Sequence, residues 1–247
     1  MIYDENEIAE GPHAGRRLRE VLPELGEAFL GKRVVERYGY ELPLLIKFLD
    51  TAEWLSVQVH PDDAYAHSVE AHTGFHGKNE AWVILDAEPG AEIIYGVKRP
   101  VTHEELRAAA LDGSILDLLN FVPVQPGDVI YIPAGTIHAL GPGLLVYEVQ
   151  QRSDLTYRLF DYGRGRPLHL KKALDVANLE PQPLHRLQLG TWFETPHFRL
   201  GLWDGEVEAP RDRFLTLVSR EVTAPAVVLG AGQRFHLRNT PWFVASP

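Results

Sequence analysis

The stretch P-G-D-V-I-Y-I-P-A-G-T-I-H at residues 126–138 decides the fold of this chain. Gly127 and Asp128 favour a turn that enters a strand, and Pro133 and Gly135 favour the turn that leaves it. This spacing returns His138 toward the interior of a β structure. The alternative is a chance Gly- and Pro-rich hairpin with an ordinary buried histidine, which the rest of the sequence has to exclude.

A second polar face lies upstream, in the strand-like segment W-L-S-V-Q-V-H-P at residues 54–61. Because side chains alternate between the two faces of a strand, the Leu and Val residues share one face. Ser56, Gln58 and His60 share the other. Taken alone, Q-x-H is more often part of an ordinary half-exposed strand than of a chemical site.

Short strands separated by turn signals make up most of the chain from residue 44 onward, which predicts a mainly β sandwich or jelly roll with helices as insertions. Helices are expected at residues 14–30, from Thr102 with Glu105 completing a capping box, at residues 114–120 and at residues 170–177. Strands are expected at residues 44–49, 54–59, 81–97 as a pair, 128–133, 143–150, 156–162, 198–203, 214–219, 226–230 and 233–238.

Composition excludes several classes of function. A net charge of −10 argues against a nucleic-acid-binding surface, which needs a basic stripe. No run of 18 apolar residues is present and the first residues are acidic, so we expect a cytoplasmic protein that does not cross a membrane. The chain has no cysteine, so any metal must take nitrogen and oxygen donors. Nothing in the sequence indicates the oligomeric state.

The combined motifs resemble a known family. Residues 126–138 match the second cupin motif, and Q-V-H-P-D-D, G-K-N-E-A-W and T-Y-R-L-F-D-Y occur in the order and at the spacing of the type I mannose-6-phosphate isomerases. The first cupin motif normally supplies H-x-H and a later Glu, whereas this chain has Gln58 before His60, with Glu80 following. The resemblance runs from about residue 11 to residue 181 and continues more weakly to the C-terminus.

This resemblance implies a cupin jelly-roll barrel with helical insertions at residues 1–180, followed by a second, degenerate cupin-like β domain at residues 181–247. It also implies one zinc ion per chain, bound by Gln58, His60, Glu80 and His138. Independently of the family, two imidazoles, one carboxylate and one amide form a nitrogen and oxygen site that suits zinc. Iron, manganese or cobalt would also accept these ligands.

The family's activity is the interconversion of mannose 6-phosphate and fructose 6-phosphate, so the expected partner is a small sugar phosphate. Its catalytic arginine falls on Arg158. Four further positions match polar residues around the family's substrate pocket: Ser56, Lys47, Lys78 and Glu148. The group that moves the proton between the two carbons stays open among Glu148, a water activated by the metal and a histidine of the pocket wall.

Two departures from the family leave an alternative function open. The chain lacks the W-G-G-like and G-E-x-W-E-like segments that usually precede the first helix, so we expect a shortened N-terminus. The C-terminal part has Gly-Gln where the cupin motif has Gly-Asp, and lacks the motif histidine. The alternative is therefore a cupin that binds a sugar or sugar phosphate without turning it over. A cupin-type glucose-6-phosphate isomerase is disfavoured, because that family keeps the H-x-H that Gln58 interrupts.

Three further histidines, His67, His72 and His76, lie in the long connection between His60 and Glu80. We interpret them as surface residues. Gly74 argues against His72 and His76 facing one metal from a regular helix.

Overall fold

The computed structural model describes residues 3–187, 192–219 and 226–247. Its internal contacts divide the chain into two units. Phe48–Leu187 form one, called here the central unit; Met1–Lys47 together with Gln188–Pro247 form the other, called the terminal unit. The family resemblance places the first 47 residues in the catalytic domain and the boundary at residue 180, whereas contacts group these residues with the C-terminal segment.

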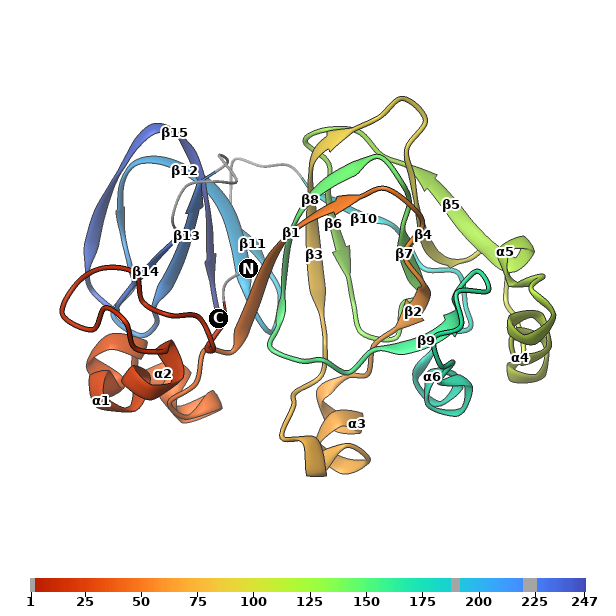
Figure 1. The fold of residues 1–247 in the computed structure, drawn as a ribbon, viewed down its shortest axis with the longest axis horizontal. Helices are drawn as coiled ribbons and strands as arrows, with labels where there is room; N and C mark the ends of the chain where they lie inside the picture. Colours follow the sequence, from red (N-terminus) through yellow and green to blue (C-terminus); the bar gives the residue numbers. More distant parts are fainter. Residues whose placement is uncertain (1–2, 188–191, 220–225) are drawn as a thin grey trace. The chain divides into compact units, whose positions relative to one another are not determined.

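Two five-stranded sheets build the central unit (Figure 1). The first has the order β1 (Leu44–Thr51, of which Phe48–Thr51 belong to the central unit), β8 (Leu144–Gln151), β3 (Glu80–Ala87), β6 (Val129–Ile132) and β10 (His185–Leu187). The second has the order β5 (Leu119–Pro123), β4 (Glu92–Val97), β7 (His138–Leu140), β2 (Val57–Val59) and β9 (Tyr157–Phe160). The predicted mainly β architecture with helical insertions is confirmed.

Strands that are distant in sequence lie side by side in the second sheet. Strand β2 pairs with both β7 and β9 in antiparallel orientation. In this register Gln58 lies opposite His138 on one side and opposite Arg158 on the other. Residues directly opposite each other in a sheet point to the same face, so the pairing gathers three polar side chains on one face.

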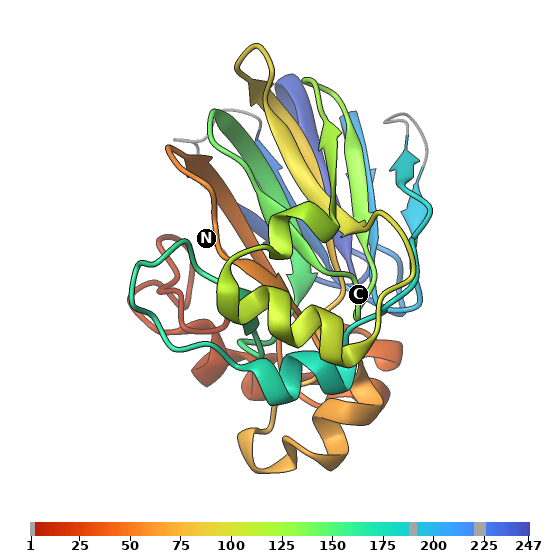
Figure 2. The same cartoon turned by 90° about the vertical axis from the view of Figure 1, so that its right-hand side faces the viewer.

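Apolar side chains cover both faces of this second sheet. On the outer face, Val57 and Val59 pack in one cluster with α4 (His103–Asp112), α5 (Ile115–Leu118) and α6 (Leu170–Val176). Figure 2 shows α4 and α6 in front of the strands. A second cluster joins residues of both sheets, among them Trp82 and Leu140, and therefore lies between them. Because Gln58 alternates with the two valines, its side chain points away from the helices and into the space between the sheets.

Helix α4 begins after the residue that the sequence singled out as its N-cap. Thr102 caps α4 by accepting a hydrogen bond from the Glu105 amide at 3.1 Å, and Gly113 ends the helix with φ 88°. Only half of the capping box forms, because the Glu105 carboxylate pairs with Arg99 instead. Helix α5 is shorter than predicted, since Leu119 already pairs with β4. Within the described part of the chain, no helix is both long and apolar enough to span a bilayer.

The terminal unit combines two helices, α1 (Leu18–Leu30) and α2 (Lys32–Tyr38), with a third sheet. That sheet has the order β11 (Phe193–Glu194), β12 (Arg199–Glu208), β15 (Arg234–Ser246), β13 (Leu215–Ser219) and β14 (Val227–Leu229). Helix α1 starts four residues after the predicted position, and Gly26, with φ 60°, interrupts it shortly after Pro23. Gly31 links α1 and α2 with φ 88°, and a Cβ there would lie 2.2 Å from the Arg213 amide nitrogen.

A buried carboxylate fixes the loop that follows β9. Asp161 is 4% exposed and accepts hydrogen bonds from Arg164 Nη2 at 2.9 Å and Arg166 Nε at 2.8 Å. These contacts, Arg166 first, hold the pKa of Asp161 below its usual range despite burial. Arg164 also donates to the Trp54 carbonyl oxygen at 2.8 Å, so the loop is tied to the segment that leads into β2.

Asp161→Asn should therefore destabilise the protein by about 1.5–3 kcal/mol at pH 7, the range for a hydrogen bond to a charged group. The folded-state pKa of Asp161 is lowered, so its contribution is present above the unfolded value of about 3.9 and is lost as pH falls through the folded value. Urea unfolding at pH 7 and near pH 3 measures this. The gap between wild type and variant should narrow at the lower pH, while the exposed control Asp86→Asn changes little at either. A gap of the same size at both pH values would contradict the ion-pair account.

Candidate metal centre

Three buried side chains from different strands converge between the sheets of the central unit. His60 follows β2, Glu80 opens β3 and His138 opens β7, and none is more than 1% exposed. One donor atom from each lies within 4.8 Å of the others. His138 Nε2 is 3.2 Å from Glu80 Oε1, and His60 Nε2 is 3.6 Å from Glu80 Oε2. The structure thus brings together three of the four predicted metal ligands.

Backbone carbonyls orient both imidazoles. His60 Nδ1 lies 2.9 Å from the Leu155 carbonyl oxygen, and His138 Nδ1 lies 2.8 Å from that of Thr136. A ring nitrogen at this distance from a carbonyl donates its N–H, so whenever the ring is neutral its lone pair lies on Nε2, the atom near Glu80. Metal-binding histidines usually have their tautomer fixed by a hydrogen bond of this kind. Burial, followed by the nearby Lys78, holds the pKa of His60 well below its usual range, which favours the neutral ring.

The Glu80 carboxylate needs a positive charge beside it. Among the described residues, neither carboxylate oxygen has a hydrogen bond of normal geometry, although both are buried. Lys78 Nζ lies 3.1 Å from Glu80 Oε2 and 2.9 Å from His60 Nε2. Burial alone would raise the pKa of Glu80, but the positive charge of Lys78 holds it well below its usual range. An anionic carboxylate facing two imidazole lone pairs is the donor set of a divalent cation.

Gln58 and Arg158 extend the same face. Gln58 Nε2 is 3.4 Å from His138 Nε2, and a half-turn of the amide would place Oε1 there. Arg158, opposite Gln58 on β9, is half-buried, and its Nε donates to the Pro167 carbonyl oxygen at 3.2 Å. The register therefore places Arg158, which carries a permanent positive charge, and Gln58 on the same face of the sheet.

The remaining predicted residues lie at different places. Ser56 is 4% exposed and precedes β2, and Glu148 lies on β8, also 4% exposed. Lys78 is within the cluster itself. Lys47 lies on β1 but is the last residue of the N-terminal segment of the terminal unit, and it is half-buried. Its role at the substrate stays a prediction.

Sequence reasoning missed Trp82, which connects the cluster to Glu148. Its Nε1 donates to Glu148 Oε2 at 3.1 Å, and its ring lies 5.5 Å from the His138 ring, edge to face. The sequence did carry a signal for this residue. Trp82 is two residues after Glu80 on β3, so strand alternation places both side chains on one face, as it does for Gln58 and His60. Trp82 thus packs against one candidate ligand and orients a second carboxylate.

Comparison with known proteins gives the family. Residues 7–84 match the family described as "Phosphomannose isomerase type I, catalytic domain". A mannose-6-phosphate isomerase of Streptococcus mutans is 38% identical over 228 residues, which are 86% of this chain and 69% of that protein. The chain belongs to the type I phosphomannose isomerase family.

Further relatives agree with this assignment. ManA of Bacillus subtilis, a mannose-6-phosphate isomerase, is 44% identical over 67% of this chain and 56% of that protein. The crystal structure of the mannose 6-phosphate isomerase from Bacillus subtilis superposes with a TM-score of 0.74 at 32% identity, covering 98% of this chain and 85% of that one. The matched residues 7–84 of the phosphomannose isomerase family include Gln58, His60 and Glu80, whereas His138 lies beyond them.

The contact between Lys78 and Glu80 predicts that Lys78→Met destabilises the metal-free protein. Removing one partner of a buried charge pair costs about 3–5 kcal/mol, because the other charge stays buried without compensation. Urea unfolding of protein treated with a chelator measures this loss, with the exposed Lys98→Met as control. Adding Glu80→Gln to Lys78→Met should restore part of the loss. If Lys78→Met is as stable as wild type without metal, Lys78 does not compensate Glu80.

Proposed function

We propose that this chain interconverts mannose 6-phosphate and fructose 6-phosphate with one divalent ion held by His60, Glu80 and His138. One observation carries the proposal: in a member of this family, two oriented imidazoles and a buried carboxylate face one another within 4.8 Å. Gln58 completes the proposed ligand set from the neighbouring position on β2. A sugar phosphate is an anion, which explains why a chain of net negative charge has basic residues such as Lys78 close to the cluster.

Zinc suits this donor set best, because nitrogen and oxygen ligands in a four-coordinate arrangement are typical of its sites. When bound, a divalent ion supplies a Lewis acid for the negative charge that develops on the sugar's carbonyl oxygen. The chain orients the ligands in advance, through the carbonyl groups of Leu155 and Thr136.

The chain's own residues supply the remaining functions of an aldose–ketose isomerase. The reaction moves a proton between C1 and C2 of the sugar, so negative charge forms on the oxygen of the enediolate. Arg158 stabilises that charge, since its guanidinium stays protonated and offers several donors. Lys78, within hydrogen-bond distance of two candidate ligands, is assigned to the reacting end of the sugar. Ser56 is proposed to hold the phosphate, whose binding energy positions the reacting carbons.

Arg158→Ala should lower kcat for mannose 6-phosphate by about 10²–10³-fold, the loss expected when one stabilising donor to an oxyanion is removed. Its metal content should stay at the wild-type level, because Arg158 is not a ligand. The control is Arg99→Ala, which removes an exposed arginine of the same unit that pairs with Glu105 and donates to the Pro100 carbonyl oxygen. The measurement combines a coupled assay for fructose 6-phosphate with metal analysis, before and after chelation.

Three outcomes would contradict the proposal in different ways. Unchanged turnover after complete chelation would remove the metal from the reaction. Near-normal turnover of Arg158→Ala would remove Arg158 from it. Binding of mannose 6-phosphate by the metal-loaded protein without any turnover would identify the chain as a non-catalytic cupin that recognises a sugar phosphate.

A further inference from the structure

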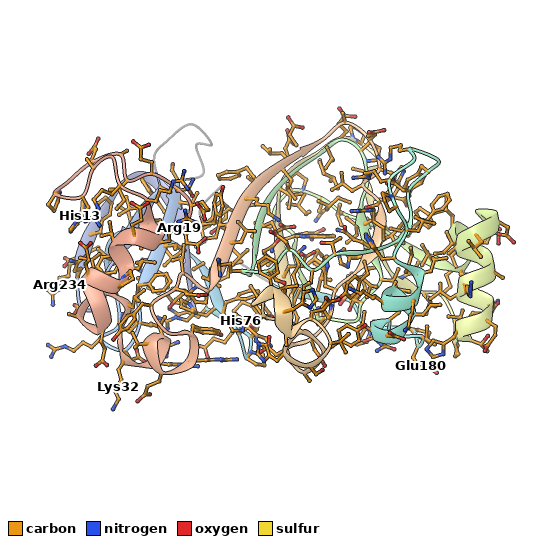
Figure 3. All side chains as sticks on the ribbon, turned by 60° about the horizontal axis from the view of Figure 1, so that its bottom comes forward. His13, Arg19, Lys32, His76, Glu180 and Arg234 are labelled. Atoms are coloured by element: carbon orange, nitrogen blue, oxygen red, sulfur yellow. The ribbon has the colours of Figure 1, made fainter. Side chains whose placement is uncertain are left out.

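A second group of metal-binding side chains lies outside the cluster described above, in the connection between His60 and β3. Asp63 and His67 lie one turn apart on α3 (Asp63–Ser68), and His76 lies in the loop before β3. One donor atom from each lies within 4.8 Å of the others. His67 Nε2 and His76 Nδ1 are 2.9 Å apart, and Figure 3 labels His76.

Local contacts hold this second cluster in place. Asp63 Oδ1 accepts hydrogen bonds from the Gly77 amide at 2.9 Å and from Gln151 Nε2 at 3.0 Å. Gly77 packs so closely on the start of α3 that a Cβ there would lie 2.4 Å from the Asp63 nitrogen. The loop carrying His76 is therefore fixed against the helix carrying the other two residues. Such hydrogen bonds to a carboxylate are the kind that orient metal ligands.

The chemistry of the cluster fits a divalent ion of the zinc type. Two imidazole nitrogens and one carboxylate oxygen leave a fourth position to water in a tetrahedral site. Two nitrogens bound to one zinc ion at tetrahedral angles are about 3.4 Å apart, so His67 and His76 need to separate by only about 0.5 Å. The proton they now share would move to an outer ring nitrogen, leaving a lone pair on each facing atom.

The two clusters are joined by short stretches of chain. His60 is followed within three residues by Asp63, and His76 precedes Lys78 by two residues. The Lys78 amide donates to the Pro61 carbonyl oxygen at 2.9 Å, so the two ends of the connection are already paired where they leave the first cluster. An ion bound by Asp63, His67 and His76 would join the two ends of the connection at a second point, farther from the first cluster.

We propose that Asp63, His67 and His76 form a second, structural site for a zinc-type divalent ion, distinct from the one at His60, Glu80 and His138. The ion ties α3 to the loop that leads into β3. It thereby restrains the backbone that carries Lys78 into the first cluster. Sequence patterns alone favour surface histidines at His67 and His76, because only the folded connection brings residues nine positions apart into contact with Asp63.

The test counts zinc by titrating metal-free full-length protein against a chromophoric chelator. Wild type should bind two equivalents. His67→Gln and His76→Gln should each weaken one of them by at least about 10-fold, the lower bound for disturbing a metal's surroundings. His72→Gln is the matched control, because His72 is an exposed histidine of the same connection outside the cluster, and it should keep both equivalents.

A second measurement separates this proposal from the proposed function. In the His138→Ala background, zinc should still raise the melting temperature, because binding to the folded state stabilises it. Adding His67→Gln should abolish that rise.

A single equivalent in wild type that His67→Gln leaves intact would overturn the second site and leave the first untouched. A single equivalent lost in His67→Gln but kept in His138→Ala would support the second site and overturn the first. An equal loss in His72→Gln would mean diffuse binding by surface histidines and would also overturn the second site.

Discussion

The central unit depends on one constraint, the burial of the Glu80 carboxylate between two sheets. A buried carboxylate is costly unless positive charge or hydrogen bonds compensate it. Here compensation comes from Lys78 at 3.1 Å, while two imidazoles present their lone pairs at 3.2 Å and 3.6 Å. Lone pairs cannot neutralise a carboxylate. The arrangement therefore requires a cation, and the lysine and a metal ion both meet that requirement.

Strand alternation makes this burial possible. Each strand of the second sheet turns one apolar row toward the helices and one mixed row inward, so the polar residues face the space between the sheets without interrupting the apolar row. Antiparallel pairing of β2 with β7 and β9 then sets Gln58, His138 and Arg158 side by side. A shift of one residue in β2 would turn Gln58 toward the helices and bury a valine in its place. Register is thus a requirement of function as much as of folding.

Much of this arrangement is predictable from the sequence, because period-two alternation and the turn residues of 126–138 are local signals. They place His138, and His60 with Gln58, on inward faces. Other features depend on distant partners. Strand β7 is three residues long and too short to show a period, and Leu119 falls within a predicted helix although its pairing with β4 makes it a strand residue. The contact of Lys78 with the candidate ligands likewise arises only when the connection folds back.

We propose that His60, His138 and Glu80 bind one zinc ion through the two Nε2 atoms and the carboxylate. X-ray absorption at the zinc edge tests it most directly, on His67→Gln protein loaded with one equivalent so that only the first cluster is filled. We expect scattering from two imidazoles at about 2.0–2.1 Å together with oxygen ligands. A spectrum without imidazole scattering would contradict it, because the buried histidines would then not be ligands.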